Sequence, residues 1–249
     1  MIYTKNMVRL AIKAEDFVKS RPLLSRFLGK MPRKFRKVFH LNGKGEEQIF
    51  TEIFQGNLWG DRESSSGSGS NLAETRTIRR DLPFLLWKYG IRSVLDVPCG
   101  DYNWMKEMKL SGIRYIGGDI VKSLIDANNR KCGSEGWTFI EMNILKDPIP
   151  KVDLVFVRDC LVHFSFPDVF RALRNVCASG STFLLTTTFP CRAQNRNIST
   201  GDWRPLNLQK EPFSFPEPVE ILYEDHPVAE YSDKSLAMWN VRDIVSCLP

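Results

Sequence analysis

Short apolar runs and helix-like patterns alternate along the chain from residue 91 onward. Seven runs have the length and the β-branched or aromatic content of strands: 93–98, 114–120, 137–142, 153–158, 182–189, 220–224 and 235–241. Segments with helical spacing of apolar residues separate the earlier runs, at about 102–110, 121–131 and 160–178. Strands separated in this way pair in parallel through right-handed crossovers, so we predict an α/β protein with a doubly wound, mostly parallel sheet.

The regions on either side of this alternation are less regular. Residues 190–219 form an excursion rich in Pro and Asn, and unstructured connections of this length in compact domains are often functional. Residues 74–90 predict a helix that ends at Gly90, and Pro83 is expected to break or kink it. Residues 60–71 have no apolar side chain, so they are either a flexible linker or a mobile flap that closes over a ligand through backbone N–H groups.

Positive charge is concentrated at the N-terminus. Residues 1–45 hold 12 Lys or Arg against Glu15 and Asp16, a net charge of +10 within a total of +6. We therefore predict a basic helical arm over residues 1–45 and a separate domain over residues 46–249. The arm either docks on an anionic surface (a membrane, a nucleic acid or an acidic partner) or packs as an amphipathic helix on its own domain.

Composition sets the broad class of the protein. An apolar fraction of 43% allows a sizeable core, and no run approaches the roughly 18 apolar residues of a membrane span. The N-terminal residues lack the pattern of a secretory signal. Six cysteines without a C-x-x-C pair or a nearby His cluster indicate neither a disulfide scaffold nor a metal site. We expect reduced cysteines and a cytoplasmic location.

The end of the first predicted strand carries the most informative motif, Asp96-Val-Pro-Cys-Gly-Asp101. Gly100 permits a tight turn and a close approach of the backbone to a ligand. The chain has no G-x-x-x-x-G-K-[ST], which excludes a P-loop, and Pro98, Asp101 and Trp104 occupy the other glycine positions of a dinucleotide motif. The two carboxylates would repel a pyrophosphate but attract a ligand with a positive end. S-adenosylmethionine, with its ammonium and sulfonium groups, fits these requirements.

The following strand ends supply polar groups for the rest of such a ligand. Asp119 follows Asp96 by 23 residues, where an acidic side chain accepts both ribose hydroxyls. Asn143, next to Ile144 at the third strand end, suits the edge of an adenine.

Four motifs, LDVPCGD, YIGGDI, FIEMNI and DLVFVRDCLVHF, resemble those of the class I S-adenosylmethionine-dependent methyltransferases. The resemblance covers roughly residues 75–190, and it implies a seven-stranded sheet with an antiparallel C-terminal strand and S-adenosylmethionine as cofactor. The family usually has a second glycine at the position of Pro98 and commonly an Asp at that of Asn143. The motifs assign cofactor binding to Asp96, Pro98, Cys99, Gly100, Asp101, Asp119, Ile120, Asn143, Ile144 and Arg158. The pieces ESSSGSGS, TGDWRPLNL and DKSLAMWNV also resemble a bacterial subgroup of unassigned substrate.

Two residues after the fourth strand are candidate catalytic groups. Asp159 and His163 are four residues apart, so on a helix they share one face. His163 would accept a proton from the acceptor, while Asp159 orients His163 or contacts the acceptor. Alternatively, His163 only caps or packs against the crossover.

The excursion offers candidate substrate-binding residues: Asn195, Asp202, Trp203 and Arg204. Donors, acceptors and an aromatic platform suit a polyhydroxylated ligand such as a sugar. Alternatively, Trp203 anchors the core and Arg204 is its neighbour on the surface.

These features favour a methyltransferase that acts on a small-molecule or glycan-like acceptor, most simply on oxygen. In the family that the motifs resemble, an N-P-P-[YF] stretch after the fourth strand is typical of methylation of amide nitrogens and nucleic-acid bases. This chain lacks it, so the resemblance favours other acceptors. The alternatives are an RNA methyltransferase that grips phosphates with the arm, and a non-catalytic protein that binds S-adenosylmethionine. The sequence fixes neither the acceptor nor the oligomeric state.

Overall fold

The computed structural model describes residues 43–108, 110–132 and 137–249, and residues 44–249 form one compact unit. The basic arm predicted over residues 1–45 lies almost wholly outside the described residues, so its helical pattern and its docking role stay predictions. Within the described ranges, no helix combines the length and the apolar character needed to cross a membrane.

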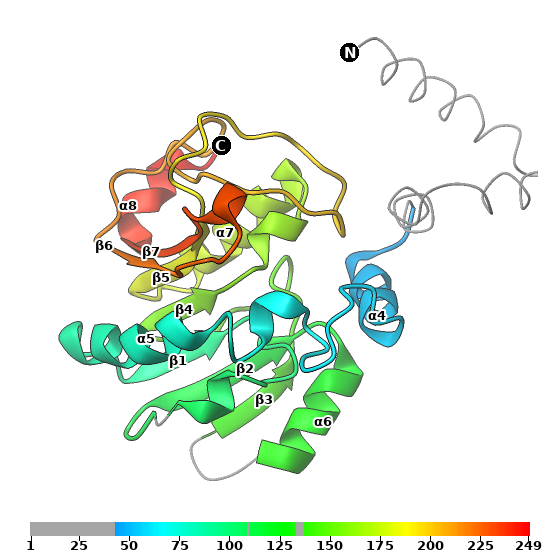
Figure 1. The fold of residues 1–249 in the computed structure, drawn as a ribbon. Helices are drawn as coiled ribbons and strands as arrows, with labels where there is room; N and C mark the ends of the chain where they lie inside the picture. The colour runs from blue at the N-terminus through cyan, green and yellow to red at the C-terminus, as the bar shows by residue number, and fades with distance from the viewer. Residues whose placement is uncertain (1–42, 109, 133–136) are drawn as a thin grey trace, which may run out of the picture. The chain divides into compact units, whose positions relative to one another are not determined.

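A seven-stranded sheet forms the centre of the unit, with the order β3-β2-β1-β4-β5-β7-β6 (Figure 1). Its strands are β1 (Ser93–Asp96), β2 (Arg114–Asp119), β3 (Trp137–Glu141), β4 (Leu154–Val157), β5 (Phe183–Thr188), β6 (Glu220–Tyr223) and β7 (Ser235–Asn240). Neighbouring strands from β3 to β5 are parallel, whereas β7 is antiparallel to both β5 and β6. The predicted α/β class, the mostly parallel sheet and the antiparallel C-terminal strand are confirmed.

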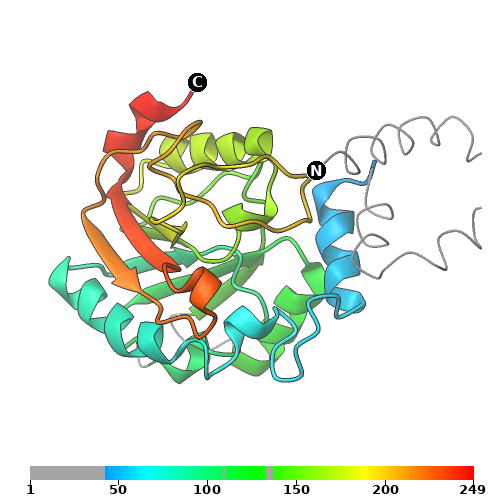
Figure 2. The same cartoon turned by 45° about the horizontal axis from the view of Figure 1, so that its top comes forward.

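Helices cover both faces of this sheet because its strands are apolar on both sides. The α-helices are α4 (Glu46–Gln55), α5 (Arg76–Lys88), α6 (Lys122–Cys132), α7 (Phe166–Ala178) and α8 (Val241–Ile244). Side chains alternate along a strand, so Leu95 and Val155 join one core with α7 and α8, while Val94 and Leu154 join a second core with α5 and α6. Figures 1 and 2 show α5 and α7 on opposite sides of the sheet.

Short 3-10 turns occupy several connections between these elements. They are η2 (Ser68–Ser70), η3 (Met105–Glu107), η4 (Leu161–His163), η5 (Ala229–Tyr231) and η6 (Val245–Cys247). Three of them, η2, η4 and η5, lie beside the carboxyl ends of the strands and contribute side chains to the site described below.

The helix predicted over 102–110 is wrong. Tyr102 has a φ of +58°, which a right-handed helix does not accept, and only the single 3-10 turn η3 forms before the backbone becomes extended at Met108. The helix predicted over 74–90 forms as α5, and it runs unbroken through Pro83, where a break or kink was expected. Its buried side, with Leu82 and Leu86, packs against the sheet on both sides of the proline.

The helix predicted over 160–178 is wrong in its first turn and a half. The side chain of Ser165 accepts the N–H of Asp168, so Ser165 caps α7 and the helix begins at Phe166. The preceding residues form η4 and an extended Phe164. Asp159 and His163 therefore do not share a helix face, contrary to the prediction.

Candidate functional site

A cavity of about 520 Å³ opens at the carboxyl ends of the parallel strands, where ligands bind in doubly wound sheets. Nine of the predicted cofactor-binding residues line it: Asp96, Pro98, Cys99, Gly100, Asp119, Ile120, Asn143, Ile144 and Arg158. Asp159, His163 and Trp203 also line the cavity, whereas Asp101, Asn195, Asp202 and Arg204 do not.

Asp119 fastens the turn after β1 to the end of β2. Its Oδ2 accepts the N–H of Gly100 (3.0 Å), and its Oδ1 accepts the N–H of Val121 (2.9 Å). Gly100 has a φ of +55°, and a Cβ here would lie 2.2 Å from Oγ of Ser66, so only glycine fits. Burial raises the pKa of Asp119 to about 6. Each carboxylate oxygen keeps a lone pair that is able to accept a ligand hydroxyl.

Asp96 is a second buried carboxylate beside this turn. The hydroxyl of Tyr115 donates to its Oδ2 (2.6 Å). Burial raises the pKa of Asp96 to about 7, although the Tyr115 hydrogen bond opposes the shift. A cation in the cavity would favour the ionised forms of both carboxylates, so the electrostatics suit a guest with a positive end.

The part of the cavity near the end of β3 is mostly apolar. Its lining there is Ile120, Val121, Leu124, Met142, Asn143 and Ile144. The backbone around Asn143 is fixed, because its Oδ1 accepts the N–H of Leu145 (2.9 Å) and its own N–H donates to Asp147 (2.7 Å). An apolar slot with one amide in its wall suits a purine ring.

Four charged side chains form a partly buried network beside β4. Arg158 donates to Glu224 through Nη2 (2.7 Å) and Nε (3.3 Å), and its guanidinium lies 5.4 Å from the ring centre of Trp104. Nζ of Lys234 lies 2.7 Å from Asp159 and 3.2 Å from Glu224. Although burial opposes the shift, Lys234 and Arg158 hold the pKa of Asp159 well below its usual range.

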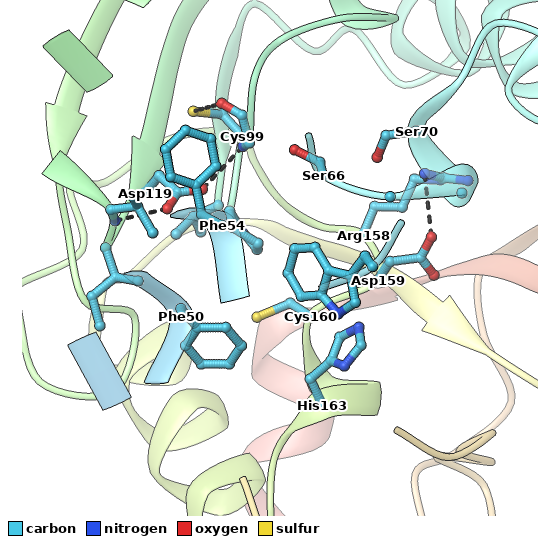
Figure 3. Close-up of a pocket in the computed structure, with 18 of the residues that line it drawn as sticks. Phe50, Phe54, Ser66, Ser70, Cys99, Asp119, Arg158, Asp159, Cys160 and His163 are labelled. Atoms are coloured by element: carbon cyan, nitrogen blue, oxygen red, sulfur yellow. Dashed lines mark hydrogen bonds and ion pairs between the residues drawn. The ribbon is translucent and has the colours of Figure 1, made fainter. Parts of the chain in front are cut away.

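This network fixes the charge of Asp159. An ionised carboxylate that is paired with two cations stays ionised at neutral pH, so Asp159 is a poor proton acceptor. It makes no hydrogen bond to His163 in the structure, although its charge favours the protonated imidazole. Figure 3 shows both residues at the same side of the cavity.

His163 presents one defined nitrogen to a ligand. Its Nδ1 lies 2.9 Å from the backbone oxygen of Asp202. A carbonyl oxygen only accepts, so we assign the proton to Nδ1 and the free lone pair to Nε2. Burial lowers the pKa of His163, which keeps the imidazole neutral, and the ring packs 5.3 Å from the ring of Trp59.

Asp101 lies outside the cavity and acts on it through the Ser/Gly segment, residues 64–70. Its carboxylate accepts hydrogen bonds from the hydroxyls of Ser64 (3.0 Å), Ser65 (3.2 Å) and Ser66 (3.3 Å) and from the Ser65 N–H (2.8 Å). Residues 65–70 line the cavity, and Gly69 lies so close to Asp159 that a Cβ would be 2.9 Å from its Oδ2. Asp101 thus positions the Ser/Gly segment at the cavity, and the direct cofactor contact predicted for it stays a prediction.

Three of the four predicted substrate residues support the excursion instead. Nδ2 of Asn195 donates to the carbonyls of Asn207 (2.8 Å) and Glu211 (2.8 Å), which fixes the loop. Asp202 bonds His163 through its backbone oxygen, and its exposed side chain is not part of the cavity lining. Arg204, predicted to bind substrate or to lie on the surface, is fully buried and bonds backbone carbonyls.

Trp203 does line the cavity, as part of an aromatic wall. Its ring centre lies 5.1 Å from that of Tyr231 and 6.2 Å from that of Phe189. Other lining residues were missed from the sequence: Glu46, Phe50, Phe54, Trp59, His226, Val228, Tyr231 and Lys234. Phe50 and Phe54 carry a weak signal, an apolar stripe with Ile49 and Ile53 on α4, but the segments at 226–234 carry none.

Comparisons with known proteins agree with this arrangement. A family model described as a methyltransferase domain matches residues 94–180. The structure resembles N-methyltransferase NodS from Bradyrhizobium japonicum WM9 in complex with S-adenosyl-L-homocysteine, with 13% identity, a TM-score of 0.55, and 76% of this chain and 97% of that chain covered.

A second solved structure is also similar. The methyltransferase domain of bacterial CtHen1 aligns with 12% identity and a TM-score of 0.50 over 68% of this chain and 100% of that chain. At these identities the likeness concerns the fold. No curated protein matches the sequence.

Proposed function

We propose that this chain, which contains a class I S-adenosylmethionine-dependent methyltransferase domain, methylates a hydroxyl group of a small-molecule or glycan-like acceptor, with His163 as general base. The observation that carries the proposal is that His163 lines the cavity while its Nδ1 is bonded to the backbone oxygen of Asp202, which leaves the lone pair of Nε2 free.

The cofactor would lie across the strand ends. Asp96 and the turn at Gly100 support its charged amino-acid end, Asp119 accepts the ribose hydroxyls, and Asn143 with Ile144 borders the adenine. In this pose the sulfonium lies between the turn and the residues that follow β4. The bound cofactor supplies a methyl group that is already activated for displacement.

The residues after β4 would then serve the acceptor. Displacement at the methyl carbon would form the new carbon–oxygen bond as the carbon–sulfur bond breaks and S-adenosyl-L-homocysteine leaves, and Nε2 of His163 would take up the hydroxyl proton of the acceptor. Asp159 stays ionised and stabilises the imidazolium that forms. Alignment of the oxygen with the methyl group and exclusion of water by Trp59 and the Ser/Gly segment supply the remaining rate enhancement.

The acceptor part of the cavity favours a ring with a flat apolar face. Trp59, Phe189, Trp203 and Tyr231 line it, and such rings stack against the faces of sugars or aromatic compounds. The hydrogen-bonding set expected for a heavily hydroxylated ligand lies elsewhere, because Asn195 and Arg204 bond the loop backbone.

The proposal is tested with isotope-labelled S-adenosylmethionine and a panel of phenols, monosaccharides, amines and RNA. We expect label on a hydroxyl compound, and a rate lower by roughly 10²- to 10⁴-fold for His163→Ala, the usual contribution of a general base. Calorimetry with S-adenosyl-L-homocysteine should give the same affinity for both proteins. Label on amines or RNA alone, cofactor binding without any turnover, or full activity of His163→Ala would each refute the proposal.

A further inference from the structure

Arg204 is fully buried and has an unusual set of partners. Its Nη1 donates to the carbonyl of Leu161 (2.8 Å), its Nη2 to that of Phe164 (2.8 Å), and its Nε to that of Arg196 (3.3 Å). The two terminal nitrogens of the guanidinium thus bind the carbonyl of the first residue of the turn η4, Leu161, and the carbonyl of the residue after the turn, Phe164.

Backbone N–H groups near Arg204 bind the two remaining carbonyls of the turn. The N–H of Arg204 donates to the carbonyl of Val162 (3.1 Å), and the N–H of Gly201 donates to that of His163 (2.8 Å). All four carbonyls from Leu161 to Phe164 are therefore bound by residues 201–204. The same short segment provides the Asp202 oxygen that accepts from Nδ1 of His163.

Residues 197–200 of the excursion bind the two residues that follow Phe164. The Oγ1 of Thr200 accepts the N–H of Ser165 (3.0 Å), and the Oδ1 of Asn197 accepts that of Phe166 (2.7 Å). The position of His163 is thus set by a loop more than thirty residues away in the sequence, and not by the helix that follows it.

The burial of Arg204 is energetically unfavourable. Among the described residues no carboxylate pairs with it; besides the carbonyls it has only the ring of Phe166, 5.7 Å from its Cζ. Burial lowers the pKa of Arg204 to about 10. A buried cation without a counter-ion costs stability, and sequences tolerate such a cost mainly where a functional geometry needs it.

We propose that Arg204 is a positioning residue that fixes the turn Leu161–Phe164, so that His163 keeps its proton on Nδ1 and presents Nε2 to the acceptor. The catalytic value of this arrangement rests on the proposed base role of His163. The arrangement itself is independent of the acceptor and is measurable in the protein alone.

The charges around His163 make its pKa a second measurable consequence of the role of Arg204. Asp159, after β4, and Asp202, in the excursion, favour its protonated form, whereas Arg204 opposes it. Burial is the largest influence that lowers the pKa of His163, and it remains when the Arg204 charge is removed. Loss of that charge should therefore raise the pKa of His163 toward its ordinary value.

The test is nitrogen NMR of protein with isotope-labelled histidine, of which the chain has three. His163→Gln assigns the signal. In the wild type we expect the Nδ1–H tautomer of His163 and a pKa below that of a free histidine. In Arg204→Met we expect a mixture of tautomers and a higher pKa. In Arg204→Lys, which keeps the charge but loses the fork, we expect mixed tautomers with a smaller rise in pKa.

Arg196→Met is the matched control, because Arg196 is an exposed arginine of the same segment that donates to the carbonyl of Trp203 (3.3 Å) and not to the turn. It should leave the tautomer unchanged. Binding of S-adenosyl-L-homocysteine checks that each variant is folded. A folded Arg204→Met or Arg204→Lys protein with the wild-type tautomer and pKa would overturn the inference. If neither variant folds, an Nε2–H tautomer in the wild type would still overturn it.

The result separates this inference from the proposed function. If the Arg204 variants alter the His163 signal but His163→Ala keeps full methyl transfer, Arg204 positions the imidazole and the imidazole is not the base. Once an acceptor is known, Arg204→Lys should lower kcat while leaving the acceptor KM close to that of the wild type.

Discussion

Asp96 and Asp119 are carboxylates held in an environment that disfavours their charge. Each is almost fully buried and has a pKa raised by burial, to about 7 and about 6. The proposed cationic guest in the adjoining cavity would favour the ionised forms of both groups. Without that guest, the two groups make the stability of the protein depend on pH.

The sign of this dependence follows from the direction of the shift. The native state holds a proton on Asp96 between its ordinary pKa of 3.8 and about 7, where the unfolded chain has lost it. The stabilisation is complete below the ordinary pKa and is lost as the pH rises through 7.

Asp96→Asn should remove this dependence. Between pH 5 and 7 the unfolding free energy of the wild type should fall relative to that of the variant, by up to about 1.4 kcal/mol per pH unit for one proton. Urea unfolding of both proteins across this range measures the difference. A constant difference from pH 5 to pH 8 would show that Asp96 is already ionised in the folded protein.

Single residues differed in how far the sequence revealed them. Asp96, Gly100 and Asp119 were predictable as cavity residues, because each follows a recognisable apolar strand. Arg204 was not predictable as a buried residue. It lies in a polar excursion, where a charged side chain is ordinarily exposed. The helical pairing of Asp159 and His163 failed because the cap at Ser165 starts a new helix.

Among the elements, the Ser/Gly segment shows how composition alone leaves structure undecided. The same small residues suit a free linker or a covering segment. The decisive partner is Asp101, more than thirty residues later in the chain, which accepts hydrogen bonds from Ser64, Ser65 and Ser66. The segment is then held at the cavity beside Trp59 and Asp159.

Asp101→Ala should release the segment from the cavity. The loss of several hydrogen bonds to an ionised carboxylate should weaken binding of S-adenosyl-L-homocysteine by about tenfold or more, and cleavage by proteases within residues 60–71 should become faster. Calorimetry and limited proteolysis measure the two effects. Asp126→Ala is the control, since Asp126 is an exposed carboxylate that pairs with Lys122 on α6 (2.8 Å).

Unchanged affinity together with unchanged cleavage in Asp101→Ala would contradict the positioning role. Faster cleavage with unchanged affinity would place the segment outside the cofactor contacts.

All seven strands were predictable from periodicity, with ends within a few residues, because packing on a two-faced sheet enforces an apolar pattern. The longer helices were also predictable, although α7 begins six residues later than expected. The 3-10 turns that carry site residues were not.

In the whole molecule, the sheet order brings together groups that are distant in sequence. Lys234, just before β7, and Glu224, just after β6, pair with Arg158 and Asp159, which follow β4. The aromatic wall similarly joins Trp203 of the excursion to Tyr231. No local sequence pattern indicates such contacts, so the residues on the acceptor side of the cavity could not be predicted from the sequence. The residues on the cofactor side could be predicted, because they lie in recognisable motifs.

The central claim is that one cavity holds the cofactor with its sulfur directed at His163. The most direct measurement is a crystal structure with S-adenosyl-L-homocysteine bound. We predict ribose hydroxyls on Asp119, adenine beside Asn143, and the sulfur facing Nε2 of His163 across a gap that admits one acceptor atom. A ligand whose sulfur points away from His163, or whose adenosine lies against the aromatic wall, would contradict the account.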